Sequence, residues 1–328
     1  MLKERILETL RFFDLQDYPL TLLELQRFLL PDMAELLPAL DRQGEIQPGK
    51  LGPDAPRPET GAAELLRCLH EELSGAVVCA LGFYCLAGRQ QLAVLRLENY
   101  FYGIRREKLL RRFAPGLKFL PFVRGAALAG SQALGQEKSA SDIDLLIIAD
   151  PRYLWLTRTL VTAYFQVLGL RRHGRHVADR FCLNHYLAGP KAITQLRNFY
   201  TAAEYVKLRP LAYPHAIWQF QDGNASWLLC LLPNAELAEP PLDRGSSLQA
   251  WLEKPFLGAW GSWLERKLKN WQLPKIRQEK FIVVAEDELS FHPQSKQQAL
   301  LQNFLAPLLK RQTPAAEAAD SGAADTLN

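Results

Sequence analysis

Hydrophobic residues recur at helical spacing near the start of the chain and predict three short helices. The segment ERILETLRFFDL, residues 4–15, repeats apolar residues every three or four positions, as on one face of an α-helix. Thr21 and Glu24 have the spacing of a capping box, so we expect the second helix to begin after Thr21. The third helix, MAELLPALDRQGEI, is expected to begin after Asp32 and to end at Gly44.

Strand-like segments follow these helices and complete a pattern typical of a winged helix-turn-helix. The tripeptide EIQ (45–47) reads as a short strand, and ALGFYCLAG (80–88) as the aromatic strand of a hairpin. Pro and Gly residues between them mark an inserted loop at about residues 48–78, which also carries a short helix. We assign residues 1–90 to this winged-helix-like module.

The remainder of the chain predicts an α+β fold. Residues 91–120 have a helical, basic pattern and form a connector. Residues 121–190 hold the strand-like segments FVRGAALAGS, DIDLLIIAD and RFCLNHYLAG, with a long helix after Pro151, so we expect a mixed sheet flanked by helices. Residues 191–312 are mainly helical in pattern. Residues 313–328 have too few large apolar side chains to fold and predict a disordered tail.

Composition predicts a globular protein in the cytoplasm. Of the 328 residues, 48% are hydrophobic, enough to bury the cores of more than one domain. No apolar run approaches the roughly 20 residues of a membrane span, and Glu4 and Glu8 interrupt what would have to be the apolar core of a signal peptide. We therefore predict no membrane partner. The five scattered cysteines lack metal-ligand spacing and are expected to be reduced core residues.

Basic residues are concentrated in two blocks. Residues 89–124 hold nine Lys or Arg against two Glu, and residues 151–178 hold five Arg and no acid. Such blocks suit either solvated helix faces or a polyanionic partner such as a nucleoside triphosphate or nucleic acid.

Two aspartates, Asp142 and Asp144, stand at the start of the aliphatic strand. Because strand side chains alternate between faces, both carboxylates share one face, about 7 Å apart. They repel each other without a cation, and Mg²⁺ prefers one or two carboxylates together with phosphate oxygens. The pair therefore predicts a site for one or two Mg²⁺ ions and a nucleoside triphosphate. Gly130 permits close backbone approach, and Ser131 with nearby N–H groups is expected to contact the triphosphate.

Gly130-Ser131 followed by Ser141-Asp142-Ile143-Asp144 resembles the signature of the DNA polymerase beta-like nucleotidyltransferase superfamily. The segments RFCLNHYLA, FYTAAEYVKLRPL, GNASWLLCLLPN and LSFHP resemble uncharacterised bacterial proteins that carry a nucleotidyltransferase domain behind an N-terminal helix-turn-helix. The resemblance covers about residues 1–310, apart from the inserted loop. It implies a nucleotidyltransferase-type sheet at residues 121–190.

The resemblance also implies a reaction and a set of site residues. A nucleoside monophosphate would pass from the triphosphate to a hydroxyl acceptor on a small molecule, an RNA or a protein. Asp142 and Asp144 would bind metal and act in catalysis, and Gly130, Ser131 and Ser141 would bind the nucleotide.

Two assignments stay open at this point. Active members of the superfamily have a third carboxylate on a neighbouring strand, where this chain has Asn184. Asp179, just ahead of that strand, is either the third catalytic carboxylate or an ordinary cap at its start. Arg158 either binds the nucleotide phosphates or belongs to a solvated helix face.

A different class of function is an alternative. The protein would then be a DNA-binding or protein-binding regulator whose inactive nucleotidyltransferase fold serves as a nucleotide sensor or scaffold. Nucleic-acid binding has weak support, because the third helix offers only Arg42 and carries the acids Glu35 and Asp41.

Overall fold

The computed structural model describes residues 1–41, 43–47, 60–135, 137–243, 245–278, 283–285, 287–291 and 294–312. Residues 48–59 of the expected inserted loop and the expected tail at 313–328 lie outside the described residues. The α-helices are α1 (Leu2–Asp14), α2 (Leu22–Arg27), α3 (Met33–Leu36), α4 (Ala62–Glu71), α5 (Gln91–Phe113), α6 (Gly130–Leu134), α7 (Leu154–Val167), α8 (Phe199–Val206), α9 (Pro214–Gly223), α10 (Ala225–Leu231), α11 (Ser247–Glu253), α12 (Ala259–Ile276) and α13 (Gln294–Gln312). Short 3₁₀ helices are η1 (Leu37–Ala39), η2 (Ala114–Phe119) and η3 (Lys254–Phe256).

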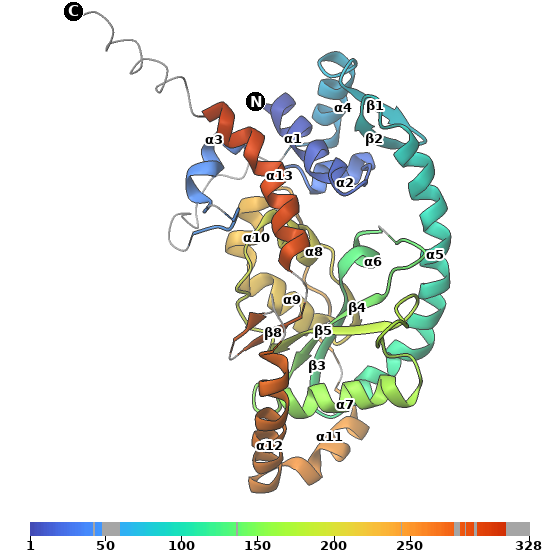
Figure 1. Cartoon of the computed structure of the whole chain (residues 1–328), viewed down its shortest axis with the longest axis vertical. Helices are drawn as coiled ribbons and strands as arrows, with labels where there is room; N and C mark the ends of the chain where they lie inside the picture. The colour runs from blue at the N-terminus through green and yellow to red at the C-terminus, as the bar shows by residue number, and fades with distance from the viewer. Residues whose placement is uncertain are drawn as a thin grey trace, which may run out of the picture.

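A mixed β-sheet lies at the centre of the α+β fold (Figure 1). Its described strands run in the order β6-β3-β4-β5-β8-β7, and a separate hairpin pairs β1 with β2. The strands are β1 (Val77–Ala80), β2 (Phe83–Leu86), β3 (Val123–Leu128), β4 (Ile143–Ala149), β5 (Phe181–Ala188), β6 (Arg209–Ala212), β7 (Val283–Val284) and β8 (Glu288–Ser290). β4 and β5 are parallel, and the other described pairs are antiparallel. The sheet is wider than residues 121–190, because β6, β7 and β8 come from later in the chain.

Both faces of the central strand β4 are buried. Ile143, Leu145 and Ile147 pack into a core that also contains side chains of α7 and the end of α5. Leu146 and Ile148 pack on the opposite face, in a core shared with α8, α9 and α10. A strand covered on both faces has no polar alternation along its length. This explains the unbroken aliphatic run that follows Asp144.

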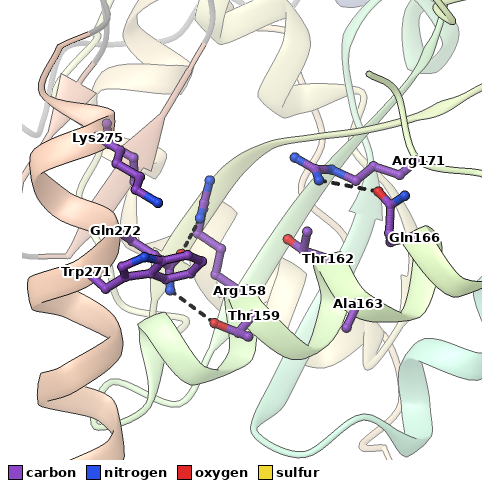
Figure 2. Close-up of a pocket in the computed structure, with 10 residues that line it drawn as sticks. Arg158, Thr159, Thr162, Ala163, Gln166, Arg171, Trp271, Gln272 and Lys275 are labelled. Atoms are coloured by element: carbon purple, nitrogen blue, oxygen red, sulfur yellow. Dashed lines mark hydrogen bonds between the residues drawn. The ribbon is translucent and has the colours of Figure 1, made fainter. Parts of the chain in front are cut away.

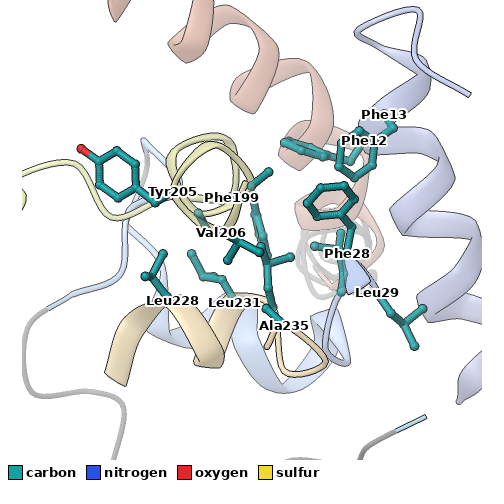
Figure 3. Close-up of a cluster of buried hydrophobic side chains, with 14 of the residues drawn as sticks. Phe12, Phe13, Phe28, Leu29, Phe199, Tyr205, Val206, Leu228, Leu231 and Ala235 are labelled. Atoms are coloured by element: carbon teal, nitrogen blue, oxygen red, sulfur yellow. The ribbon is translucent and has the colours of Figure 1, made fainter. Parts of the chain in front are cut away.

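The N-terminal helices share that second core with helices from the C-terminal half of the chain. Figure 3 shows Phe12, Phe13 and Phe28 beside Phe199 of α8 and Leu231 of α10. The ring centroids of Phe12 and Phe199 are 6.0 Å apart. Residues of α13 join the same cluster. The N-terminal module therefore packs directly on the rest of the molecule.

The second and third helices begin where the sequence predicts, but the third is shorter than expected. Thr21 and Glu24 form the expected capping box at α2, and the Asp32 side chain accepts a hydrogen bond from the Ala34 N–H at α3. α3 ends at Leu36 and passes into η1, which contains Pro38. Proline has no N–H to donate and its ring clashes with the preceding turn, so an α-helix across residues 33–46 is interrupted there.

The long helix α5 connects the β1–β2 hairpin to the region of α7 along one side of the molecule (Figure 1). Near its start, Arg96 forms a two-pronged ion pair with Glu24, the residue that also caps α2. Near its end, the carbonyl of Phe113 accepts a hydrogen bond from the Tyr164 hydroxyl on α7. The basic connector expected at residues 91–120 is thus fixed at both ends. No described helix combines the length and the apolar character that crossing a lipid bilayer requires.

Strand β8 carries a buried acid, Glu288, which is only 1% exposed. Its Oε1 lies 3.2 Å from His185 Nε2 on β5, and its Oε2 accepts a hydrogen bond from the Gln195 N–H at 2.9 Å. Burial by itself raises the pKa of Glu288. The hydrogen bond and charge of His185, together with hydrogen bonds from Gln195 and Thr194, outweigh the effect of burial, so the pKa is lowered. Glu288 thus stabilises the β5–β8 edge as a carboxylate.

Replacing Glu288 should therefore destabilise the fold in a pH-dependent way. Since the folded pKa is depressed, the stabilisation is present above the unfolded pKa of about 4.3 and is lost as pH falls through the folded value. We expect Glu288→Gln to lower the free energy of unfolding by roughly 1–3 kcal/mol at pH 7, with a smaller difference from wild type in more acidic buffer. Urea unfolding at both pH values measures this.

The matched control is Glu239→Gln, because Glu239 also faces a histidine, His215, but is exposed. This control should leave stability within about 0.5 kcal/mol of wild type. Equal stability of Glu288→Gln and wild type at pH 7 would contradict the assignment.

Candidate functional site

Gly130, the first residue of α6, lies against the Asp144 side chain. Gly130 has φ +64°, and a Cβ atom added there would overlap the Asp144 carboxylate. The Ala129 N–H also donates to the Asp144 carbonyl at 3.0 Å. Glycine is required at this position both for the left-handed backbone and for the space that the carboxylate occupies.

The N–H of Gly130 already has a protein partner. It donates to Oε1 of Glu204 at 2.9 Å, and Glu204 is buried on α8. The sequence predicts that N–H groups near Ser131 contact the triphosphate, but in this structure the Gly130 N–H is held by the Glu204 carboxylate. Ser131 is the second residue of α6 and is half-buried.

Asp142 and Asp144 lie together with a cysteine that the sequence did not single out. One ligand atom each from Asp142, Asp144 and Cys182 lies within 4.8 Å of the others, and we call these three residues the acid–thiol cluster. Register explains the grouping, because Asp144 on β4 pairs with Cys182 on the parallel strand β5. In the sequence, only the position of Cys182 in the strand after β4 pointed to it. That position identifies Cys182 as a neighbour of Asp144 only once the register between β4 and β5 is known.

Two further side chains donate hydrogen bonds to the aspartates of the acid–thiol cluster, and one of them is charged. Arg172 Nη1 donates to Asp142 Oδ2 at 2.6 Å and lies 3.3 Å from the Cys182 sulfur. Asn184 Nδ2 donates to Asp144 Oδ1 at 2.9 Å. Burial raises the pKa of the Cys182 thiol, and the charges of Asp144 and Asp142 raise it further. The thiol is therefore neutral beside the two carboxylates.

Asp179 lies outside the acid–thiol cluster and is engaged elsewhere. Its carboxylate forms ion pairs with Arg105 at 3.1 Å and with Arg106 at 3.0 Å. Arg106 is completely buried and also donates to the carbonyls of the loop before β4, at Lys138 and Ser139. This arrangement favours the interpretation of Asp179 as a residue that fixes the start of β5 over the interpretation as a third catalytic carboxylate.

Ser141 also serves the loop before β4. Its hydroxyl oxygen accepts a hydrogen bond from the Lys138 N–H at 3.0 Å, and its carbonyl accepts one from the Asp179 N–H at 3.1 Å. Ser141 therefore stabilises the turn that places Asp142 at the start of β4.

A cavity of about 400 Å³, which we call the site cavity, opens beside the acid–thiol cluster. Cys182 and Asn184 form part of its wall, and Arg158, Arg171 and Arg172 bring positive charge to it. Arg158 comes from α7 and is held by a hydrogen bond to Gln272 of α12. The candidate phosphate ligand Arg158 thus shares one cavity with the residues around the acid pair.

The oxygen donors of the cluster fit Mg²⁺. Mg²⁺ takes one or two carboxylates and completes its shell with water and phosphate oxygens, which Asp142 and Asp144 allow. A thiol is a soft ligand that suits Zn²⁺ better than Mg²⁺, so Cys182 adds nothing to a magnesium site.

Comparisons of the chain with protein-family models, with curated proteins and with solved structures give no match in any of the three.

The two interpretations of Asp179 make different predictions for Asp179→Asn. If Asp179 compensates the buried Arg106, the substitution should lower the free energy of unfolding by about 3–5 kcal/mol. Binding of Mn²⁺ to the folded protein, measured by electron paramagnetic resonance, should stay near the wild-type affinity. Asp142→Asn gives the reverse pattern, with Mn²⁺ binding lost and stability changed by at most about 1 kcal/mol, since Arg172 is half-exposed. A stable Asp179→Asn variant that fails to bind Mn²⁺ would restore the third-carboxylate role.

Proposed function

We propose that this protein is a Mg²⁺-dependent nucleotidyltransferase that moves a nucleoside monophosphate from a nucleoside triphosphate to a hydroxyl acceptor. The observation that carries the proposal is the convergence of Asp142 and Asp144 with Cys182, which lines a cavity together with three arginines. Paired carboxylates beside clustered guanidinium groups are what a metal-bound triphosphate requires. The resemblance of the Gly-Ser and Asp-x-Asp motif to the nucleotidyltransferase signature also supports the proposal, and Gly130 and Asp144 of this motif are in contact.

Each group of residues has a distinct task in the proposed reaction. Asp142 and Asp144 hold the cation, which when bound supplies charge neutralisation at the phosphates. Arg158, Arg171 and Arg172 orient the phosphate oxygens from the cavity wall. Arg172 forms an ion pair with Asp142 in this structure. Its guanidinium therefore already lies beside the position proposed for the metal-bound phosphate.

The acceptor hydroxyl attacks the α-phosphorus, and pyrophosphate leaves. Its proton needs a nearby base. Within the acid–thiol cluster only Asp142 and Asp144 are carboxylates, so the pair that holds the cation also has to accept that proton.

A second candidate function follows from the same observation. With Asn184 beside Asp144 and Asp179 paired to arginines, the described residues of the cluster lack a third carboxylate. This favours an alternative in which the site binds metal and nucleotide without transfer, as a sensor or scaffold.

The winged-helix interpretation of residues 1–90 belongs to this proposal as well. It is supported by the order of α1, α2 and α3 before the β1–β2 hairpin. Because α1 and α2 contribute to the core shared with α8 and α13, we propose that the module acts in packing or protein contact rather than in binding DNA.

A labelling experiment tests the proposed transfer. The protein is incubated with Mg²⁺, cell lysate and each triphosphate labelled at the α- or the γ-phosphate. We expect label to enter an acceptor only from the α-position, because a nucleoside monophosphate is transferred. Asp144→Asn should reduce transfer by about 10²-fold or more, since charge stabilisation of the transition state is lost.

Asp222→Asn is the control, because Asp222 is an exposed acid on α9, distant in sequence from the cluster. It should transfer label at the wild-type rate. Mg²⁺-dependent triphosphate binding that Asp144→Asn abolishes, without any labelled acceptor, would support the sensor. Transfer of the γ-label would refute nucleotidyl transfer.

A further inference from the structure

Tryptophan is unusually exposed in the C-terminal part of this protein. Of the seven tryptophans in the chain, Trp251, Trp260, Trp263 and Trp271 are between 43% and 63% exposed. Trp251 lies on α11 and the other three lie on α12. Leaving such large apolar rings in water is unfavourable, and clustered exposed aromatics mark binding surfaces.

The three α12 tryptophans form one continuous stripe with two lysines. Trp260, Trp263, Lys267, Trp271 and Lys275 are three or four residues apart, so they lie along one side of the helix over about 22 Å. We call these five residues the tryptophan stripe. The rings of Trp260 and Trp263 stack with centroids 4.9 Å apart, and Lys275 Nζ lies 4.2 Å from the centre of the Trp271 ring. The stripe therefore presents two stacked aromatic rings followed by a lysine, a third aromatic ring and a second lysine.

The stripe leads into a groove between α7 and α12. Trp271 and Lys275 form one wall of a cavity of about 400 Å³, and Arg158, Thr159, Thr162 and Gln166 of α7 form the other (Figure 2). Gln272 links the walls, since it accepts a hydrogen bond from Arg158 and donates one to Thr159 Oγ1 at 3.0 Å. We call this cavity the α7–α12 groove.

The α7–α12 groove adjoins the site cavity. Arg158, Thr162, Arg171 and Ile276 line both. A ligand lying on the tryptophan stripe would thus pass two arginines and end beside the acid–thiol cluster. Glu265, the acid on the packed side of α12, accepts hydrogen bonds from the Trp155 and Leu156 N–H groups and does not oppose an anion in the groove.

We propose that the tryptophan stripe and the α7–α12 groove bind single-stranded RNA and present its terminal hydroxyl to the acid–thiol cluster. Stacking on aromatic planes beside basic residues is how proteins hold single strands. The hydroxyl group of Thr162 and the amide group of Gln166 match the ribose 2′-hydroxyl, which donates and accepts hydrogen bonds. A membrane or a second copy of the chain explains the aromatics but makes no use of the arginines within the groove.

The acceptor role rests on the proposed transferase, whereas the RNA affinity does not. In the transfer step, the terminal oxygen of the RNA forms a bond to the α-phosphorus of the triphosphate. The bond to the β-phosphate bridging oxygen breaks, pyrophosphate leaves, and the hydroxyl proton passes to an aspartate of the cluster.

Fluorescence anisotropy with a labelled RNA of about 12 nucleotides, a length within the site sizes of single-strand binders, tests the binding. Trp271→Ala should weaken binding at least about fivefold, the lower end of the loss of one base–aromatic stack, and Trp271→Phe should recover most of it. Lys275→Gln should instead lower the salt dependence, log Kd against log salt, by about 0.7, as expected for one lost phosphate contact.

Trp251→Ala is the matched control, because Trp251 is equally exposed but lies off the stripe. It should bind RNA as wild type does. Wild-type affinity in Trp271→Ala, equal affinity for DNA of the same sequence, or binding through Trp271 to phosphatidylserine vesicles without RNA affinity would each overturn the proposal. So would a dimer in light scattering that Trp260→Ala dissociates.

The double variant Asp142→Asn, Asp144→Asn separates the two proposals. It should keep wild-type RNA affinity while losing transfer. RNA binding without transfer by the wild-type protein would refute the transferase and leave the RNA site intact. Transfer to an acceptor in a Trp271→Ala variant at the wild-type rate would refute the RNA site and leave the transferase intact.

Discussion

Parallel pairing of β4 with β5 is the interaction on which the candidate site depends. It places Asp144 beside Cys182 and brings Asn184 within hydrogen-bonding distance of the Asp144 carboxylate. Two carboxylates this close are unfavourable without compensation, and Arg172 supplies it at Asp142. The strands tolerate this polar group at their start because the rest of both strands is buried between two hydrophobic cores. The charge of the acid–thiol cluster is therefore confined to the starting ends of β4 and β5.

The connection before β4 is held by a buried cation. Arg106 of α5 pairs with Asp179 and donates to the Lys138 and Ser139 carbonyls, so one guanidinium joins the long helix, the loop before β4 and the start of β5. At the other end of α5, Arg96 pairs with Glu24 of the N-terminal module. The same helix thus contacts both the module and the site.

Positive charge and exposed aromatics gather on the side of the site formed by α7 and α12. Arg158 and Arg171 line both the site cavity and the α7–α12 groove, so the two spaces adjoin between the tryptophan stripe and the acid–thiol cluster. The basic block at residues 151–178 is therefore divided between cavity walls and solvent. A basic block indicates either a solvated helix face or a polyanionic partner. The position of Arg158 and Arg171 in the groove favours a polyanionic partner.

Local pattern alone determined the α+β class, the capped start of α2 at Thr21 and the shared face of Asp142 and Asp144. These features depend on residue spacing within one element, which the sequence contains directly. Only the tertiary structure decided that Cys182 joins the acids and that Asp179 pairs with arginines. Likewise, the tryptophan stripe on α12 borders a groove only because α7 packs beside α12. Strand register and helix packing follow from burial between residues far apart in the chain, so no local spacing encodes them.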